Sequence, residues 1–230
     1  MKEIKIIAFD ADDTLWSNEP FFQDIEREYT GLLSSYGEPK EISAELFHTE
    51  MDNLERYGYG AKGFTLSMIE TALRISKQKV PSETIEKVLL LEIGRAIELL
   101  PEVEETLNIL KQSKRYQLVV ATKGDLLDQQ RKLQRSGLSP YFDHVEIMSD
   151  KTEKEYAKLI ENLRITPNQF LMVGNSLKSD IQPVLALGGY AMHIPFEIMW
   201  QHEVVEHFEH PWLYQLKKLG ELTKLLQLTH

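Results

Sequence analysis

The sequence predicts an α/β protein with a doubly wound parallel sheet and an inserted bundle of helices. Short apolar runs, typical of strands buried on both faces, alternate with helical patterns over most of the chain. The alternation is interrupted once, over residues 17–99, where only helical patterns occur. Polar residues follow several of the apolar runs, at the edge where α/β sheets open their binding crevice.

Five runs are predicted to be parallel strands that are buried on both faces. They are residues 4–9, 117–122, 144–148, 169–174 and 190–194. Helical patterns separate most of them, at residues 101–113, 125–136 and 152–163. Pro101 suits a helix start and Gly137 suits a helix end. Strands that alternate with helices predict right-handed crossovers and an open sheet.

The interrupting segment predicts a separate helical unit. Its apolar residues recur at helical spacing over residues 19–35, 42–56, 63–77 and 82–98, enough for a small bundle. We therefore expect a core domain of residues 1–16 and 100–230 and an inserted domain of residues 17–99. The leucine-rich tail, residues 211–230, is predicted to be helical with a packing role.

Composition limits the classes of partner. The chain has 230 residues, 42% of them hydrophobic, and a net charge of -10, which argues against nucleic acid or an anionic membrane surface as a partner. A small anionic substrate stays compatible, because a metal ion or a lysine can reverse the local charge. The absence of cysteine, of a signal-peptide pattern and of an apolar run of ~20 residues leads us to expect a cytoplasmic protein.

Three acids gather directly after the first predicted strand, in the stretch "FDADDT". Residues two apart in an extended chain point the same way, so Asp10 and Asp12 are expected to face one side. Asp13 points the other way, either into solvent or toward a backbone amide. Like charges this close are unfavourable unless a cation or a bound substrate offsets them.

The later strands add polar groups at the same edge of the predicted sheet. Thr122 ends the second strand, Lys151 follows the third, and Asn175 follows the fourth, with Asp180 five residues further on. Acids, a hydroxyl, a lysine and an oxygen-rich loop suit a hard cation and a phosphoryl group.

Four motifs then appear in order, "AFDADDTLW", "VVATKGD", "SDK" and "MVGNSLKSD". With them the chain resembles the haloacid dehalogenase (HAD) superfamily of phosphohydrolases over nearly its whole length. The resemblance implies a HAD-like core, and it implies that the inserted helices are a C1-type cap.

The resemblance also implies a role for each motif residue. Asp10 would be the nucleophile that forms an aspartyl-phosphate, and Asp12 would be the general acid and base. Thr122 and Lys151 would hold the phosphoryl oxygens. Mg²⁺ would bind Asp10, the backbone carbonyl of Asp12 and the fourth motif, which carries Asn175 and Asp180. The implied reaction is hydrolysis of a small phosphomonoester, such as a nucleoside monophosphate or a sugar phosphate.

The fourth motif departs from the phosphatase pattern, which usually reads Gly-Asp where this chain has Gly174-Asn175. Either Asn175 is a neutral metal ligand, or Asp180 takes over directly or through water. Asn175-Ser176 followed by Asp180 also resembles the metal-independent 2-haloacid dehalogenases of the superfamily. Those enzymes lack the second aspartate of the first motif, so Asp12 favours a phosphatase. A non-catalytic binding module is a further alternative.

Two lysines outside these roles are candidate substrate-binding residues. Lys123 follows Thr122 directly, and Lys62 lies after the glycine-rich stretch "YGYG" of the inserted segment. The glycines near Lys62 would equally suit a plain turn between helices. Lys154 competes with Lys151 for the phosphate-binding role, but Lys151 lies nearer the strand end. The oligomeric state stays open.

Overall fold

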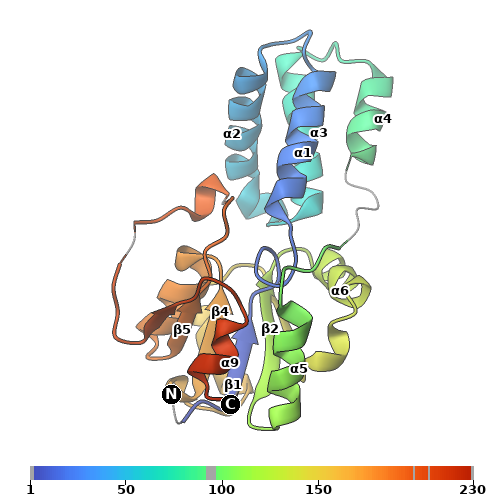
Figure 1. The fold of residues 1–230 in the computed structure, drawn as a ribbon. Helices are drawn as coiled ribbons and strands as arrows, with labels where there is room; N and C mark the ends of the chain where they lie inside the picture. Colours follow the sequence, from blue (N-terminus) through green and yellow to red (C-terminus); the bar gives the residue numbers. More distant parts are fainter. Residues whose placement is uncertain (1–2, 92–96, 199, 207, 229–230) are drawn as a thin grey trace. The chain divides into compact units, whose positions relative to one another are not determined.

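The computed structural model describes all residues except 1–2, 92–96, 199, 207 and 229–230 (Figure 1). The chain divides into two compact units, and each is described by itself. The sheet unit comprises Met1–Glu19, Ile97–Lys123 and Gln129–His230, and the helical unit comprises Pro20–Ala96 and Gly124–Asp128. Among the described residues, no helix is both long enough and apolar enough to cross a bilayer.

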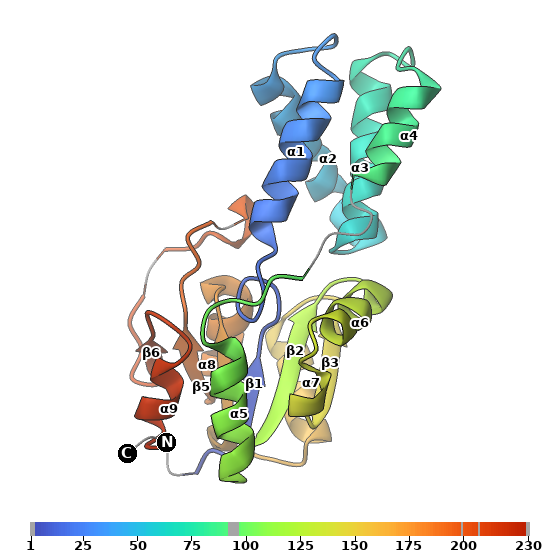
Figure 2. The same cartoon turned by 45° about the vertical axis from the view of Figure 1, so that its right-hand side comes forward.

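The sheet unit contains a parallel sheet with the strand order β3-β2-β1-β4-β5-β6 (Figures 1 and 2). The strands are β1 (Ile6–Phe9), β2 (Gln117–Lys123), β3 (His144–Met148), β4 (Phe170–Gly174), β5 (Tyr190–His193) and β6 (Leu213–Gln215). The first strand in the chain lies between the second and the fourth. The carboxyl ends of β1, β2 and β4 therefore lie side by side.

Helices cover both faces of this sheet (Figures 1 and 2). They are α5 (Val103–Ser113), the part of α6 (Leu126–Arg135) that begins at Gln129, α7 (Glu153–Asn162), α8 (Gln182–Ala186) and α9 (Glu221–Leu225). Alternate residues of β1 point to opposite faces: Ile7 and Phe9 pack with α5 and α9, while Ile6 and Ala8 pack with α7 and α8. The doubly wound parallel α/β core is thus confirmed.

The edges of the sheet differ from the sequence prediction. The tail contains the strand β6 before its short helix α9, so the prediction of an entirely helical tail is wrong. A three-residue strand has no periodicity that a sequence pattern can detect. The prediction that β3 is buried on both faces is also wrong, because β3 is an edge strand and Val145 is 38% exposed.

The helical unit is built from α1 (Glu19–Leu32), α2 (Pro39–Tyr57), α3 (Ala61–Ile75) and α4 (Ser82–Leu90). Glu38 and Glu41 form a capping box that starts α2, with Pro39 in the first turn. The apolar faces meet in one core of Ile25, Tyr29, Leu33, Ile42, Leu46, Phe64, Met68, Ala72 and Val88.

The last predicted helix of the inserted segment is shorter in the structure. It was expected over residues 82–98, but α4 ends at Leu90, residues 97–98 are not helical, and residues 92–96 lie outside the described part. In the sheet unit, Ser17 donates its backbone N–H to the Glu98 carbonyl at 2.9 Å. The chain segments that leave and re-enter this unit are thus paired. The assignment of residues 17–99 as a C1-type cap domain stays a prediction.

Candidate active site

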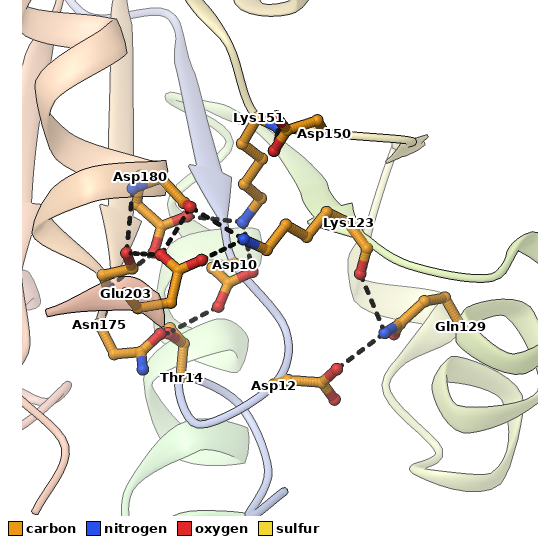
Figure 3. A network of polar contacts seen from close by, with 12 residues as sticks. Asp10, Asp12, Thr14, Lys123, Gln129, Asp150, Lys151, Asn175, Asp180 and Glu203 are labelled. Carbon is orange, nitrogen blue, oxygen red and sulfur yellow. Dashed lines mark hydrogen bonds and ion pairs between the residues drawn. The ribbon is translucent and has the colours of Figure 1, made fainter. Parts of the chain in front are cut away.

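The structure gathers polar groups of the four motifs at the carboxyl ends of the strands in the sheet unit (Figure 3). Asp10 follows β1 directly, and its backbone N–H donates to the Val173 carbonyl of β4 at 2.9 Å. Thr122 lies near the end of β2 and is buried. Lys151 lies between β3 and α7, one residue before Thr152, whose hydroxyl caps α7. The fold therefore brings the motifs together because their strands are parallel neighbours.

The centre of the site is a buried cluster of one lysine and two aspartates. The Lys151 ammonium donates to Asp10 Oδ1 and, at 2.6 Å, to Asp180 Oδ1. The Lys151 and Asp180 side chains are 2% and 1% exposed. Lys154, the competing lysine, is exposed. Lys151 therefore lies at the charge cluster, as its position after the strand predicts.

Charge in this cluster is incompletely balanced. Burial, and then the charge of Asp180, raise the pKa of Asp10 to about 7, although Lys151 opposes the shift. Burial by itself would lower the pKa of Lys151, but Asp10 and Asp180 outweigh it, so that this pKa lies well above its ordinary value. One ammonium therefore stays charged between two carboxylates, and the cluster has negative charge in excess when both carboxylates are ionised.

The second Asp10 oxygen faces the fourth motif. The Thr14 hydroxyl lies 3.3 Å from Asp10 Oδ2 and 3.4 Å from Asn175 Oδ1. A hydroxyl carries a single hydrogen, so it can donate to only one of these oxygens at a time. The carboxylate and the amide oxygen thus converge with acceptor capacity to spare, which is the property that a hard cation requires.

Asp180 is held differently from Asn175. One Asp180 oxygen binds Lys151, and the other accepts the backbone N–H of Ser176 at 3.0 Å. A side chain at position 174 would collide with Asp180, so this close approach requires Gly174. Asp180 thus ties the loop after β4 to the catalytic-lysine candidate.

The donor set fits a magnesium ion in part. Across the described residues, no three His, Cys, Asp or Glu side chains gather in a way that could hold a metal ion. A cation at this position would therefore depend on the Asn175 amide and a backbone carbonyl besides Asp10. The excess negative charge around Asp10 is what such a cation would offset.

Asp12 lies apart from this cluster (Figure 3). Its carboxylate accepts hydrogen bonds from Trp16 Nε1 at 2.6 Å and Gln129 Nε2 at 2.8 Å, and Lys132 Nζ lies 3.2 Å from Oδ1. The two carboxylates thus have different partners, and the expectation that Asp10 and Asp12 face one side stays a prediction. Residues 13–15 form a turn between Asp12 and Trp16, which are bridged to each other, so the Trp16 indole reaches the Asp12 carboxylate.

Asp13 binds backbone amides, which is one of its two predicted roles. Its carboxylate accepts the N–H groups of Asn18 at 2.8 Å and Glu19 at 3.1 Å. Its backbone has a φ of 60°, which Asp tolerates better than most residues. Burial raises the pKa of Asp13 to about 7, against the effect of these two amides.

Lys123, a predicted substrate-binding residue, is paired within the sheet unit. Its ammonium contacts Glu203 and donates to Ser179 Oγ at 3.0 Å. The Glu203 carboxylate also accepts the hydroxyls of Ser176 and, at 2.6 Å, Ser179. Burial alone would raise the pKa of Glu203, but Lys123 and the two serines lower it to about 2. Any contact of Lys123 with substrate stays a prediction.

Three residues around the site were missed by sequence reasoning: Glu203, Gln129 and Lys132. Glu203 lies in a short 3-10 helix, Gln201–Glu203, that follows β5 at a distance and belongs to no motif. Gln129 and Lys132 lie three apart on α6, where they read as ordinary polar positions of an amphipathic helix. Only the i, i+3 spacing hinted that they share a face.

Lys62, the other predicted substrate-binding residue, belongs to the helical unit. It lies in the first turn of α3, and its ammonium pairs with Asp125 of the same unit at 2.9 Å. Gly58 and Gly60 before it have φ values of 70° and 104°, so this glycine-rich stretch forms the turn between α2 and α3. A role of Lys62 toward substrate stays a prediction.

Comparisons with known proteins agree with this architecture. A haloacid dehalogenase-like family hydrolase of known structure from Xanthomonas campestris is 31% identical, with a TM-score of 0.87, covering 98% of this chain and 91% of that one. The glyceraldehyde 3-phosphate phosphatase of Methanothermobacter thermautotrophicus is 28% identical over 207 residues, 85% of this chain and 87% of the relative. The enzyme of the same name from Pyrococcus furiosus is 24% identical over 188 residues, 79% of this chain and 76% of the relative.

The sequence model of one family covers most of the chain. The match spans residues 4–188 and includes all four motifs, from the strand before Asp10 to the residues after Asp180. The protein therefore belongs to the haloacid dehalogenase-like hydrolase family.

Proposed function

We propose that the protein is a magnesium-dependent phosphomonoester hydrolase that acts on a small phosphorylated metabolite through an aspartyl-phosphate. The observation that carries this proposal is the buried cluster in which Lys151 joins Asp10 and Asp180 beside Asn175. A fixed carboxylate next to an ammonium suits nucleophilic attack on a phosphoryl group whose charge the ammonium can offset.

In the first step, an Asp10 carboxylate oxygen attacks phosphorus and the bond from phosphorus to the leaving alcohol breaks. Asp12, as a carboxylic acid, donates its proton to the departing oxygen. Lys151 and Thr122 bind the phosphoryl oxygens, for which Lys151 exchanges part of its contact with Asp10. The products of this step are the free alcohol and an aspartyl-phosphate at Asp10.

In the second step, water attacks the phosphorus of the aspartyl-phosphate. Asp12, now a carboxylate, takes a proton from that water, and the bond from phosphorus to Asp10 breaks. Inorganic phosphate leaves and the Asp10 carboxylate is restored. Asp12 thus returns to its starting protonation state, so the cycle balances.

Asp10, the backbone carbonyl of Asp12 and Asn175 would hold the magnesium ion. Both oxygens of Asp180 are engaged, with Lys151 and with Ser176, so we assign Asp180 to holding the lysine and the loop behind the ion. When bound, magnesium supplies positive charge to the phosphoryl oxygens and to Asp10. An amide ligand brings no charge, so we expect weaker metal binding than at an all-carboxylate site.

The names of the relatives guide the choice of substrate. Both curated relatives are glyceraldehyde 3-phosphate phosphatases, which makes triose phosphates the first compounds to test. Nucleoside monophosphates and sugar phosphates belong to the same class of small phosphomonoesters. A net charge of -10 argues against nucleic acid as a partner and stays compatible with a small anionic substrate, and the absence of cysteine fits a cytoplasmic setting.

The test is phosphate release from a panel of such esters, with magnesium and with chelator, by the wild type and by Asp10→Asn. We expect release that requires magnesium and that falls by at least about 1,000-fold in Asp10→Asn, because the nucleophile is lost. Asp13→Asn is the matched control. It changes a neighbouring acid of the same motif and keeps an oxygen for the amides of Asn18 and Glu19.

Other outcomes separate the alternatives. Phosphate release that persists in Asp10→Asn contradicts the nucleophile assignment. Chloride release from 2-haloacids, without magnesium, would support a dehalogenase, although a departing halide needs no proton from Asp12. A protein that turns over neither class of compound would be a binding module.

A further inference from the structure

Helix α6 presents two side chains to the Asp12 carboxylate. Gln129 and Lys132 lie three residues apart and therefore on one face of the helix. Gln129 Nε2 donates to Asp12 Oδ2 at 2.8 Å, while Lys132 Nζ lies 3.2 Å from Oδ1 and 3.3 Å from Oδ2. Trp16 Nε1 donates to Oδ1 at 2.6 Å. The carboxylate is thus held on both oxygens, and all of these residues belong to the sheet unit.

The orientation of the Gln129 amide is set by Asp12. Its Nε2 also donates to the Lys123 carbonyl at 3.3 Å, whereas its Oε1 is buried with no hydrogen-bond partner among the described residues. The flipped amide would place Oε1 against the carboxylate and the carbonyl, both of which are acceptors. A buried acceptor left unsatisfied is unfavourable. The hydrogen bond from Nε2 to Asp12 therefore fixes the orientation of the amide, although it leaves Oε1 unsatisfied.

Lys132 is itself held in place. Its ammonium donates to Asn18 Oδ1 at 2.8 Å besides contacting Asp12. The Lys132 and Asp12 side chains are 17% and 22% exposed, so the ion pair is largely shielded from water. A long flexible side chain fixed at both the helix and the ammonium restricts the positions that Asp12 can take.

We propose that Gln129 and Lys132 are positioning residues that aim Asp12 at the leaving oxygen of the substrate. This inference rests on the proposed function, in which Asp12 protonates that oxygen. It assigns to α6 a part in proton transfer, in addition to its packing against the sheet. It also predicts which substrates are hydrolysed more slowly when Gln129 or Lys132 no longer contacts Asp12.

The dependence on the leaving group distinguishes this role from a structural one. An alkoxide leaving group needs a proton, whereas 4-nitrophenolate leaves readily without one. The ratio kcat/KM reports the steps up to release of the alcohol, so it isolates this proton transfer from the later attack of water. Loss of general acid catalysis therefore lowers kcat/KM for an alkyl ester and spares 4-nitrophenyl phosphate.

The experiment compares glycerol 3-phosphate, or the best alkyl ester of the panel, with 4-nitrophenyl phosphate in Lys132→Met and Gln129→Met. We expect kcat/KM to fall about 10- to 100-fold for the alkyl ester and less than about 3-fold for the nitrophenyl ester, within the range of general acid catalysis. Lys132→Arg should recover part of the loss. The exposed Arg131 of the same helix provides the control Arg131→Met, which removes one positive charge and should change neither value.

A double-mutant cycle with Asp12→Asn completes the test. If Lys132 acts through Asp12, Lys132→Met has no further effect on the alkyl ester once Asp12 is replaced. Equal losses for both esters, no loss for either variant, or additive losses in the cycle would overturn the inference. A wild type inactive on both esters contradicts the proposed function itself, and this inference with it. Thermal unfolding of each variant checks that it is folded. If Lys132→Met does not fold, the comparison of the two esters in Gln129→Met still decides the test.

Discussion

The surroundings of Asp10 and Asp12 differ sharply, although the two residues are neighbours in one motif. Asp10 is 9% exposed and bound to a buried lysine, which another buried aspartate shares. Asp12 is 22% exposed and accepts hydrogen bonds from an indole, an amide and an ammonium. One carboxylate is part of an unbalanced buried charge cluster, and the other is held by donors on both oxygens. The same side chain is thus prepared for two different tasks by its contacts.

The largest effect is expected from Lys151→Met, which removes the positive charge of the Asp10 cluster. Two buried carboxylates would be left without a cation to offset their charge, and we expect the free energy of unfolding to fall by about 3–5 kcal/mol. Phosphate release should fall at least about 100-fold, because the ammonium no longer stabilises the transition state. Urea denaturation at pH 8 and the phosphate assay measure the two losses.

Lys154→Met is the control for that substitution. Lys154 is exposed on α7, three residues away, and its replacement changes the net charge equally. Its unfolding free energy should change by less than about 0.5 kcal/mol, as for most surface positions. If both variants behave alike, Lys151 is not the balancing charge of the cluster.

With magnesium chelated, Asp10→Asn should raise the free energy of unfolding and Asp12→Asn should lower it. The folded pKa of Asp10 is raised from 3.8 to about 7, so this group lowers stability progressively as the pH rises through that range. At pH 8 we therefore expect Asp10→Asn to be more stable than the wild type by about 2–4 kcal/mol, a difference that disappears near pH 4.

The free energy of unfolding of Asp12→Asn should instead fall by about 1–2 kcal/mol, because the new amide NH₂ then faces one of the donors of Trp16, Gln129 and Lys132. Urea denaturation of both variants at pH 5 and pH 8 tests the pair. A loss of stability in Asp10→Asn at pH 8 would show that Lys151 balances the cluster after all.

The Glu203 carboxylate gives a prediction of intermediate size. Its pKa falls from 4.5 in the unfolded chain to about 2 in the folded protein, so it stabilises the fold above pH 4.5 and loses this effect as the pH drops toward 2. At pH 7 we expect Glu203→Gln to be less stable by up to about 3 kcal/mol. Near pH 2 the two unfolding curves should converge, and parallel curves would contradict the assigned ion pair with Lys123.

The smallest effect is expected from Tyr156→Phe, beside the Asp10 cluster. The Tyr156 hydroxyl is buried with no hydrogen-bond partner in the described part of the chain. Removing it should leave stability unchanged or raise it by about 1 kcal/mol. Tyr29→Phe is the matched control, since its hydroxyl donates to the Met68 carbonyl at 2.8 Å, and it should lose about 1 kcal/mol. Thermal unfolding that shows the same loss in both variants would mean that the Tyr156 hydroxyl has a partner.

Local sequence patterns were sufficient to predict the strands that carry the site. The buried runs around β1, β2 and β4 are strongly apolar and are separated by helical patterns, so they indicate strands and their parallel order. Because parallel strands place their carboxyl ends at one edge, Asp10, Thr122 and Asn175 could be grouped without coordinates. Lys151 follows from the same rule.

The partners of these residues depend on contacts between distant segments. Gln129 and Lys132 reach Asp12 from α6, and Glu203 reaches Lys123 from beyond β5. No spacing in the sequence predicts these contacts, since they depend on the packing of whole elements and on the turn after Asp10. The short strand β6 is likewise defined by its partner β5 rather than by its own residues.

The sequence by itself thus determined the α/β class, the inserted helices, the family and the positions of the candidate catalytic groups. Those features follow from hydrophobic periodicity and from the order of strands, which are local or nearly so. Only the tertiary structure decided which lysine pairs with which carboxylate. Hydrogen bonds and ion pairs act over a few ångströms in space, and the residues that form them in this site lie up to 161 positions apart in the chain.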